Sequence, residues 1–151
     1  MSKAGDLRRD ELINKFKGEA LSPSTREMAY LPAITTTPLI FRHFKGNYYI
    51  AGGVAKDCDN ADRTLVIYKA CADGQVWMRE STSFFSEVDF DKYPQADSLY
   101  RLSTIPELLK SGWTWGQLAD DIISKNYKDK ELVKVLINEV MEEYYKNEQG
   151  I

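Results

Sequence analysis

The sequence predicts an α+β protein, in which a small antiparallel β-sheet or a partly open SH3-like barrel lies between an N-terminal helical arm and a C-terminal helical pair. Three observations predict it. The middle of the chain has short apolar runs separated by glycine-containing turns, as in antiparallel strands. Both ends instead have apolar residues at helical spacing, and helix-capping residues stand before those segments. The predicted boundaries are residues 1–37, 38–103 and 104–151.

The N-terminal arm is predicted to contain two short helices. The first covers residues 6–17 and has a partial apolar face. Ser22 and Pro23 begin the second, because serine caps a helix and proline suits its first position. Residues 32–38 begin and end with proline and contain three threonines, which predicts an extended linker. We therefore expect the arm to have no core of its own.

The β domain is predicted to contain about five or six short strands. Gly46 and the Asp73-Gly74 pair supply turns, because glycine tolerates the positive φ that tight turns need. Gly52 and Gly53 interrupt one strand, which predicts a bulge or the close approach of another backbone. The expected strands are residues 39–44, 48–55, 64–70, 75–79, 84–88 and 100–102.

The C-terminal extension is predicted to be helical. Two capping boxes, in which a threonine is followed three residues later by Glu or Gln, begin at Thr104 and Thr114. A third helix follows Asp129 and is amphipathic. A small sheet domain does not easily cover its apolar stripe, so we expect self-association into a homo-oligomer. The alternative is that the stripe packs on the chain's own sheet. The expected interface residues are Leu136, Val140, Met141 and Tyr144.

Charge and composition exclude several classes of protein. The chain has 20 lysines and arginines against 23 aspartates and glutamates, which gives a net charge of −3. A protein that depends on nonspecific DNA binding is usually basic, because phosphate neutralisation supplies that affinity. The apolar runs are too short to span a bilayer, and the N-terminus lacks the apolar stretch of a secretory signal. We therefore expect no membrane partner and a cytoplasmic location.

Metal and cofactor chemistry has little support in the sequence. His43 is the only histidine, and Cys58 and Cys71 do not form a CxxC motif. Structural zinc needs four ligands, mostly cysteine or histidine. The acidic run that begins at Asp57 has the start of a calcium-loop pattern, but it lacks the glycine and the terminal glutamate at the required positions. We expect no metal, no cofactor and two free thiols.

A series of motifs runs through the β domain in a fixed order. They are Phe41-Arg42-His43-Phe44-Lys45-Gly46, Gly53-Val54-Ala55-Lys56, Leu65-Val66-Ile67-Tyr68, Asp73-Gly74, Val76-Trp77-Met78-Arg79 and Phe84-Phe85. Over residues 39–90 this series resembles a small bacterial and phage family that is known only as a domain of unknown function. Because that family has no assigned reaction, the resemblance implies a fold more than a function. Its occurrence in phages is compatible with sequestration of a host nucleotide signal.

Three positions depart from the family pattern. Phe41 stands where the family has tyrosine, and Asp57 stands where it often has a second histidine. Glu80 replaces the proline that follows the Trp-x-Arg motif. The two flanking segments of the chain lie outside the resemblance.

The first candidate site is the cationic end of the strand over residues 39–44, where Arg42, His43 and Lys45 stand close together. An anion site there would use Lys45 and Arg79 as charges and His43 as a hydrogen-bond donor. A second interpretation is a solvated strand face with one packed histidine. A third makes His43 a general base, because the ordinary pKa of histidine suits that role.

The second candidate site is the strand that contains Trp77 and Arg79, which share a face because side chains alternate along a strand. An indole ring beside a guanidinium group is a common arrangement for binding nucleotides or single strands, and Tyr48, Tyr49 and Tyr68 are expected to extend such a platform. The competing interpretation places Trp77 in the core and pairs Arg79 with a surface carboxylate.

We therefore expect a non-enzymatic binding module for an anionic, planar ligand such as a nucleotide or a short single-stranded nucleic acid. The alternative is a protein–protein interaction adaptor that acts through the C-terminal amphipathic helix. A small hydrolase that uses His43 is the least favoured, since no nucleophile motif accompanies it. The expected ligand-binding residues are Arg42, His43, Lys45, Tyr48, Trp77 and Arg79.

Overall fold

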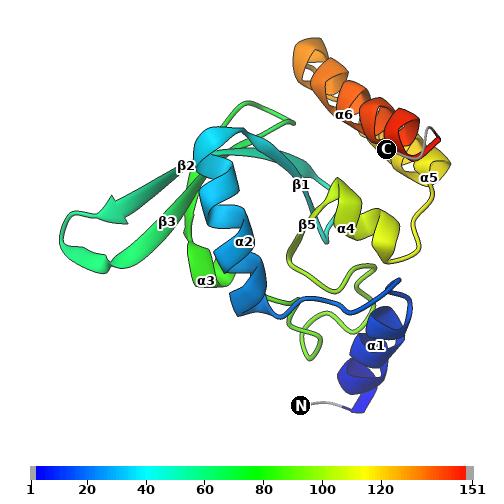
Figure 1. The fold of residues 1–151 in the computed structure, drawn as a ribbon, viewed down its shortest axis with the longest axis horizontal. Coiled ribbons are helices and arrows are strands. Elements are labelled where there is room, and N and C mark those ends of the chain that lie inside the picture. Colours follow the sequence, from blue (N-terminus) through cyan, green and yellow to red (C-terminus); the bar gives the residue numbers. More distant parts are fainter. Residues whose placement is uncertain (1–2, 149–151) are drawn as a thin grey trace.

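The structure is a computed structural model that describes residues 3–148, and it is built on one open antiparallel sheet. The strands are β1 (Leu39–His43), β2 (Tyr48–Asp57), β3 (Asn60–Ala70), β4 (Val76–Glu80) and β5 (Leu102–Thr104). Their order across the sheet is β4-β3-β2-β1-β5, and the β2–β3 hairpin projects beyond its neighbours (Figure 1). The predicted α+β class is confirmed, but the sheet does not close into a barrel, because β4 and β5 lie at opposite edges.

Helices precede and follow the sheet, and one short helix lies between β4 and β5. They are α1 (Lys3–Asn14), α2 (Pro23–Thr36), α3 (Ser81–Phe84), α4 (Ile105–Lys110), α5 (Trp115–Ser124) and α6 (Lys130–Glu148). The predicted caps are confirmed: the Ser22 side chain caps α2, and complete capping boxes begin α4 at Thr104 and α5 at Thr114. None of the helices within residues 3–148 combines the length and the apolar character that crossing a bilayer requires.

Two predictions of local structure were wrong. Residues 32–36 belong to α2 rather than to an extended linker. Pro32 removes one hydrogen bond from that helix, but the helix places Ile34, which is 1% exposed, in the core. Residues 84–88 do not form a strand: Phe84 ends α3, and Glu87 makes one isolated bridge. A strand would turn consecutive side chains to opposite faces, whereas the turn buries both Phe84 and Phe85.

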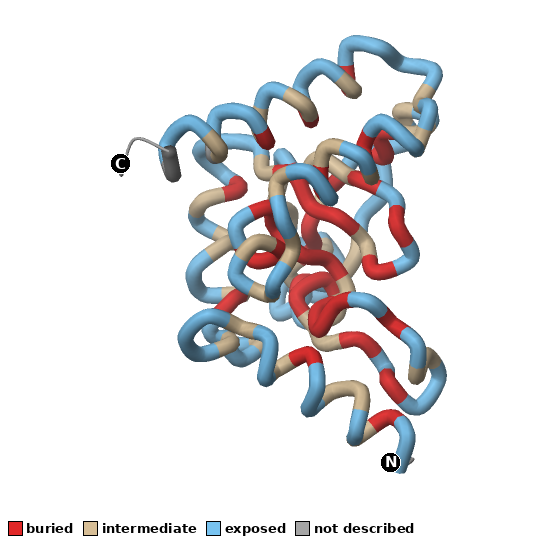
Figure 2. The backbone as a smooth tube through the Cα atoms, turned by 90° about the vertical axis from the view of Figure 1, so that its right-hand side faces the viewer, coloured by how far each residue is buried: buried red, intermediate tan, exposed pale blue. Residues whose placement is uncertain are grey.

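The two faces of the sheet are covered by different helices. Phe41, Ala51, Val66 and Tyr68 lie on one face and pack with α2 and α3. Ile40 and Tyr48 lie on the other face and pack with residues of α4, α5 and α6. A third cluster joins α1 to the loop before β5. The buried stretches meet in the middle of the molecule, with exposed helical surfaces around them (Figure 2).

The apolar stripe of α6 is covered by the chain itself. Leu136 is 0% and Val140 2% exposed, and both belong to the core beneath α5 and α6. Tyr144 packs edge-on against Trp115, with ring centroids 5.9 Å apart. Met141 keeps 39% of its surface exposed. The expected exposed stripe is therefore wrong for Leu136 and Val140, because the C-terminal helices provide each other with the apolar cover that the sheet alone does not.

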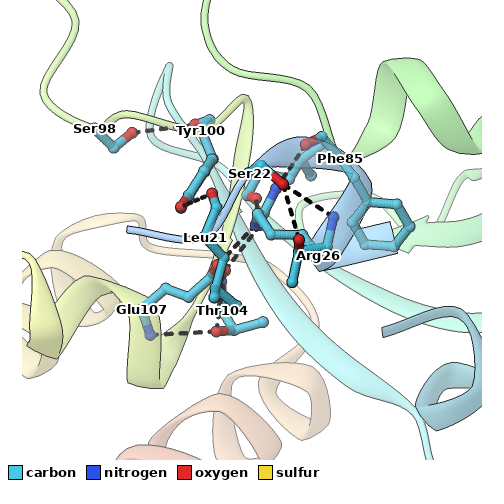
Figure 3. Close-up of polar contacts among 10 residues, drawn as sticks. Leu21, Ser22, Arg26, Phe85, Ser98, Tyr100, Thr104 and Glu107 are labelled. Carbon is cyan, nitrogen blue, oxygen red and sulfur yellow. Dashed lines mark hydrogen bonds and ion pairs between the residues drawn. The ribbon is translucent and has the colours of Figure 1, made fainter. Parts of the chain in front are cut away.

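A buried arginine connects α2 to the rest of the protein (Figure 3). Arg26 is fully buried and makes two hydrogen bonds to the Glu107 carboxylate, at 2.7 and 2.8 Å. It also donates to the carbonyl oxygens of Phe85 and Leu102, and its guanidinium lies 3.8 Å from the ring centre of Tyr100. All three nitrogens of the guanidinium group donate to partners inside the protein, so Arg26 has a structural role.

Candidate functional site

Arg42 does not belong to an anion site. It is 5% exposed and points to the sheet face beneath α5, where its Nε donates to Asp121 at 3.0 Å. Its two terminal nitrogens donate to Asp97, and the guanidinium lies 4.5 Å from the ring centre of Trp113. Burial alone lowers the pKa of Arg42, but the bonds and charges of the two aspartates outweigh burial and raise it. The expectation for Arg42 was therefore wrong, since two carboxylates already neutralise it.

Tyr48 is not part of a ligand platform either. Its side chain is fully buried, and its hydroxyl donates to Asp121 at 2.7 Å. Burial, followed by that hydrogen bond, raises the pKa of the phenol above its ordinary value. The backbone N–H of Tyr48 donates to the hydroxyl of Tyr127, so both polar groups serve the contact between β2 and the C-terminal helices.

The other predicted cations gather at the opposite face of the sheet. Arg101, Lys45 and Arg79 all act electrostatically on His43, and Arg79 also acts on Arg101. Sequence reasoning missed Arg101. Arg101 comes immediately before β5 and reaches this place because Phe44 donates its backbone N–H to the Arg101 carbonyl at 3.0 Å. We call His43, Lys45, Arg79 and Arg101 the cationic cluster.

Arg79 and Arg101 differ from every other arginine of the chain. The sequence has seven arginines, and five of them form ion pairs with carboxylates. Within the described residues, neither Arg79 nor Arg101 has a carboxylate oxygen within 4.0 Å. The charge of Asp89 raises the pKa of Arg101, but it has the smallest effect of the groups that act on that pKa. Burial, and then the charge of Arg79, lower the pKa of Arg101. These two arginines thus stand near each other without a carboxylate in ion-pair contact among the described residues.

Neutral oxygens hold these two arginines in place. Arg79 donates to the hydroxyl of Tyr68 at 3.4 Å and to that of Ser83 at 3.3 Å. Arg101 donates to the hydroxyl of Ser86 at 3.3 Å, and its backbone N–H donates to the Ser86 carbonyl at 2.9 Å. The side-chain bonds are long compared with charge-assisted bonds to an anion, which are about 2.7–2.9 Å. An anion would therefore offer the guanidinium groups shorter and stronger bonds.

His43 presents a hydrogen-bond donor to the same region. Its Nδ1 accepts from the backbone N–H of Lys45 at 3.1 Å, so the neutral ring carries its proton on Nε2. Burial, followed by the charges of Arg101, Lys45 and Arg79, lowers the pKa of His43 to about 4. The ring also stacks on Phe44, with centroids 4.6 Å apart. At neutral pH His43 is an uncharged donor in positive surroundings.

Aromatic rings border the cationic cluster. Tyr49 lies between His43 and Tyr68, with centroid distances of 6.3 and 5.4 Å. Trp77 pairs directly with Tyr68 across the β3–β4 ladder and shares a sheet face with Arg79. Trp77 is 53% exposed, so the interpretation that placed it in the core is wrong. The prediction that Trp77 shares a strand face with Arg79 is confirmed. The indole offers a free ring surface on the face where Arg79 lies.

Two other features of the molecule do not make a better anion site. A cavity of about 830 Å³ has three aspartates and two basic residues in its lining, so it has no excess of positive charge for an anion; these residues are Asp97, Asp120, Asp121, Arg8 and Lys15. The turn between β2 and β3 brings Asp57 close to Cys58 and Asp59. The Asp57 carboxylate there already accepts bonds from the Arg63 guanidinium and from the Asp59 backbone, so we assign it to the turn. Cys58 and Cys71 are both free thiols.

The comparisons with known proteins bear on the β domain. Residues 39–101 match the family described as "Protein of unknown function (DUF1653)". This match supports the resemblance to a domain-of-unknown-function family, and all four members of the cationic cluster lie within it. No match was found among curated proteins or among solved structures.

Proposed function

We propose that this protein is a binding module for a phosphorylated, nucleotide-like ligand, which it holds at the cationic cluster. The observation that carries this proposal is the pair Arg79 and Arg101, two neighbouring guanidinium groups that lack the carboxylate partners of the other five arginines. Like charges brought together in a partly buried place repel each other. A bound anion would remove that repulsion, so the arrangement favours an anionic occupant.

Phosphate suits this cluster better than a single carboxylate does. A phosphate group offers several acceptor oxygens, and two guanidinium forks can engage them at once. The Nε2–H of His43 and the Lys45 ammonium add a neutral donor and a third charge. The serine hydroxyls that now hold Arg79 and Arg101 can remain as further partners.

The nucleotide part of the proposal depends on the rings. Trp77 is the exposed aromatic side chain on the sheet face of Arg79, and Tyr49 and Tyr68 continue that face. Bases stack on such rings while guanidinium groups hold phosphates. Holding a nucleotide without altering it fits sequestration of a nucleotide signal, in a bacterial or phage setting.

The two other functions considered have less support. A general base works best when its pKa lies near the operating pH, whereas the pKa of His43 is lowered to about 4. The adaptor hypothesis needs a bare apolar stripe on α6, but Leu136 and Val140 are buried within the chain. We therefore keep ligand binding as the proposal.

Calorimetric titration tests the proposal with pyrophosphate, a nucleoside diphosphate, a cyclic nucleotide and a short single-stranded oligonucleotide. We expect a phosphorylated compound to bind below about 1 mM at low salt, and to bind more weakly as salt screens the charges. Arg79→Gln and Arg101→Gln should each weaken binding by about 1.5–3 kcal/mol, the usual contribution of a charged hydrogen bond. Arg63→Gln is the matched control, because Arg63 is already paired with Asp57 and Glu80.

Proton NMR provides a second readout, because His43 is the single histidine and its ring signal needs no assignment. A bound anion should raise the pKa of His43 from about 4, since a negative charge stabilises the protonated ring. The proposal fails if no compound binds below about 1 mM at low salt, or if both arginine variants bind like the native protein. Tight binding of the oligonucleotide alone would instead assign the site to single-stranded nucleic acid.

A further inference from the structure

The outer edge of β4 is apolar and exposed, although it ends the sheet. Val76, Trp77 and Met78 are consecutive, and their exposed fractions are 55, 53 and 68%. The strand at the other edge of the sheet, β5, is covered instead: all three of its residues are buried, at 5% exposed or less. Exposed apolar edges are places where another strand can add to a sheet, so proteins usually cover or charge them.

The backbone of β4 has groups that β3 does not use. The N–H of Ala70 donates to the Gln75 carbonyl at 2.9 Å, which makes Gln75 a residue that bonds to β3. In an antiparallel ladder such residues alternate with residues whose N–H and C=O point the other way. The outward residues are therefore Val76, Met78 and Glu80. An exposed bond confirms the direction, since the Val76 carbonyl accepts from the Gln75 side chain at 3.1 Å.

We propose that two copies of this chain pair edge to edge through β4, antiparallel and with Met78 of one copy opposite Met78 of the other. The two-fold axis then passes midway between the two copies of Met78. Met78 is an outward residue, so its N–H and C=O both bond across the interface. This pairing would join the two open sheets into one continuous sheet of two copies.

The side chains of β4 are complementary to themselves in this register. Trp77 of each copy stands opposite Arg79 of the other, on the same face of the sheet. A guanidinium group is attracted to the face of an indole ring, and both residue types are enriched among the residues that dominate binding at interfaces. Val76 stands opposite Glu80, so no like charges meet. Centring the pair on Glu80 would oppose two carboxylates, and a parallel in-register pair would oppose Arg79 with Arg79. These comparisons commit the edge to a second copy in the Met78-centred register.

The expected association is weak. Five residues of one strand bury far less than the roughly 1,200 Å² at the low end of stable interfaces. The dimer should therefore appear only at high protein concentration. The backbone pairing itself needs neither a guanidinium group nor the proposed ligand, although Arg79 belongs both to β4 and to the cationic cluster.

Engineered disulfides test the register. In a Cys58→Ser background, Met78→Cys should form a disulfide-linked dimer under mild oxidation, because the paired Cα atoms would be about 5.5 Å apart, within disulfide range. Val76→Cys is the matched control. It is about as exposed, but the two copies of residue 76 would lie four residues out of register, about 13 Å apart. The proposal is overturned if Met78→Cys forms no more covalent dimer than Val76→Cys.

Sedimentation gives an independent measurement on uncrosslinked protein. The native chain should show a concentration-dependent shift toward dimer, and Met78→Lys should abolish it by placing two ammonium groups on the axis. Ile123→Lys is the control, since Ile123 is 64% exposed and belongs to α5, which packs against α6. Dimerisation that survives Met78→Lys, or that is lost equally in Ile123→Lys, would contradict pairing through β4.

Discussion

Replacing Arg26 by methionine should destabilise the protein more than any change at its surface. Methionine keeps part of the apolar stem but removes the charge and four hydrogen bonds, two to Glu107 and one each to the carbonyls of Phe85 and Leu102. Glu107 would then be a buried carboxylate without its counter-charge. Removing one partner of a buried ion pair costs about 3–5 kcal/mol, and we expect about 4 kcal/mol for Arg26→Met.

A double-mutant cycle isolates the ion pair from the packing. Glu107→Gln removes the charge while its amide oxygen can still accept the cap bond from the Thr104 N–H. The double variant Arg26→Met/Glu107→Gln should be less destabilised than the sum of the single variants, by about 2 kcal/mol or more, because no unpaired buried charge remains. Arg26→Lys keeps the charge without the fork, so it should fall between native protein and Arg26→Met.

Urea unfolding followed by tryptophan fluorescence and circular dichroism measures these free energies. Arg63→Met is the control, because Arg63 is paired at the surface with Asp57 and Glu80, where water screens the interaction, and its unfolding midpoint should hardly move. The reasoning is refuted if Arg26→Met costs less than about 1 kcal/mol, or if the two single variants add without coupling.

Two further predictions concern titratable groups. The pKa of His43 is about 4 in the folded protein and about 6.5 unfolded, so stability contributed by the neutral ring is complete above pH 6.5 and is lost as the pH falls toward 4. Because His43 is only partly buried, water screens part of this effect, and the loss should be roughly 1–2 kcal/mol. An unchanged pH dependence in His43→Gln would refute it. Burial raises the pKa of Cys71 to about 11, so a thiol reagent at pH 8 should modify Cys58 quickly and Cys71 only on unfolding. Two equally fast thiols in the native protein would contradict the placement of Cys71.

The sequence alone predicts those parts of the fold that depend on neighbouring residues. The capping boxes at Thr104 and Thr114 determine where α4 and α5 begin, because each satisfies its own backbone donors within three residues. The turn at Gly46 and the bulge near Gly53 also follow from local backbone needs. Pro32 is the exception, since tertiary burial of Ile34 extends the helix beyond a residue that locally disfavours it.

The sequence determined that His43, Lys45 and Arg79 stand on strands or at their ends, and that Trp77 and Arg79 share a face. Only the tertiary structure decided which cations are free of carboxylates. Arg42 meets Asp97 and Asp121, and Arg101 reaches the cluster, through contacts between residues far apart along the chain. The spacing of residues along the chain does not predict these long-range contacts, because the charge partners of a side chain depend on which elements pack beside it.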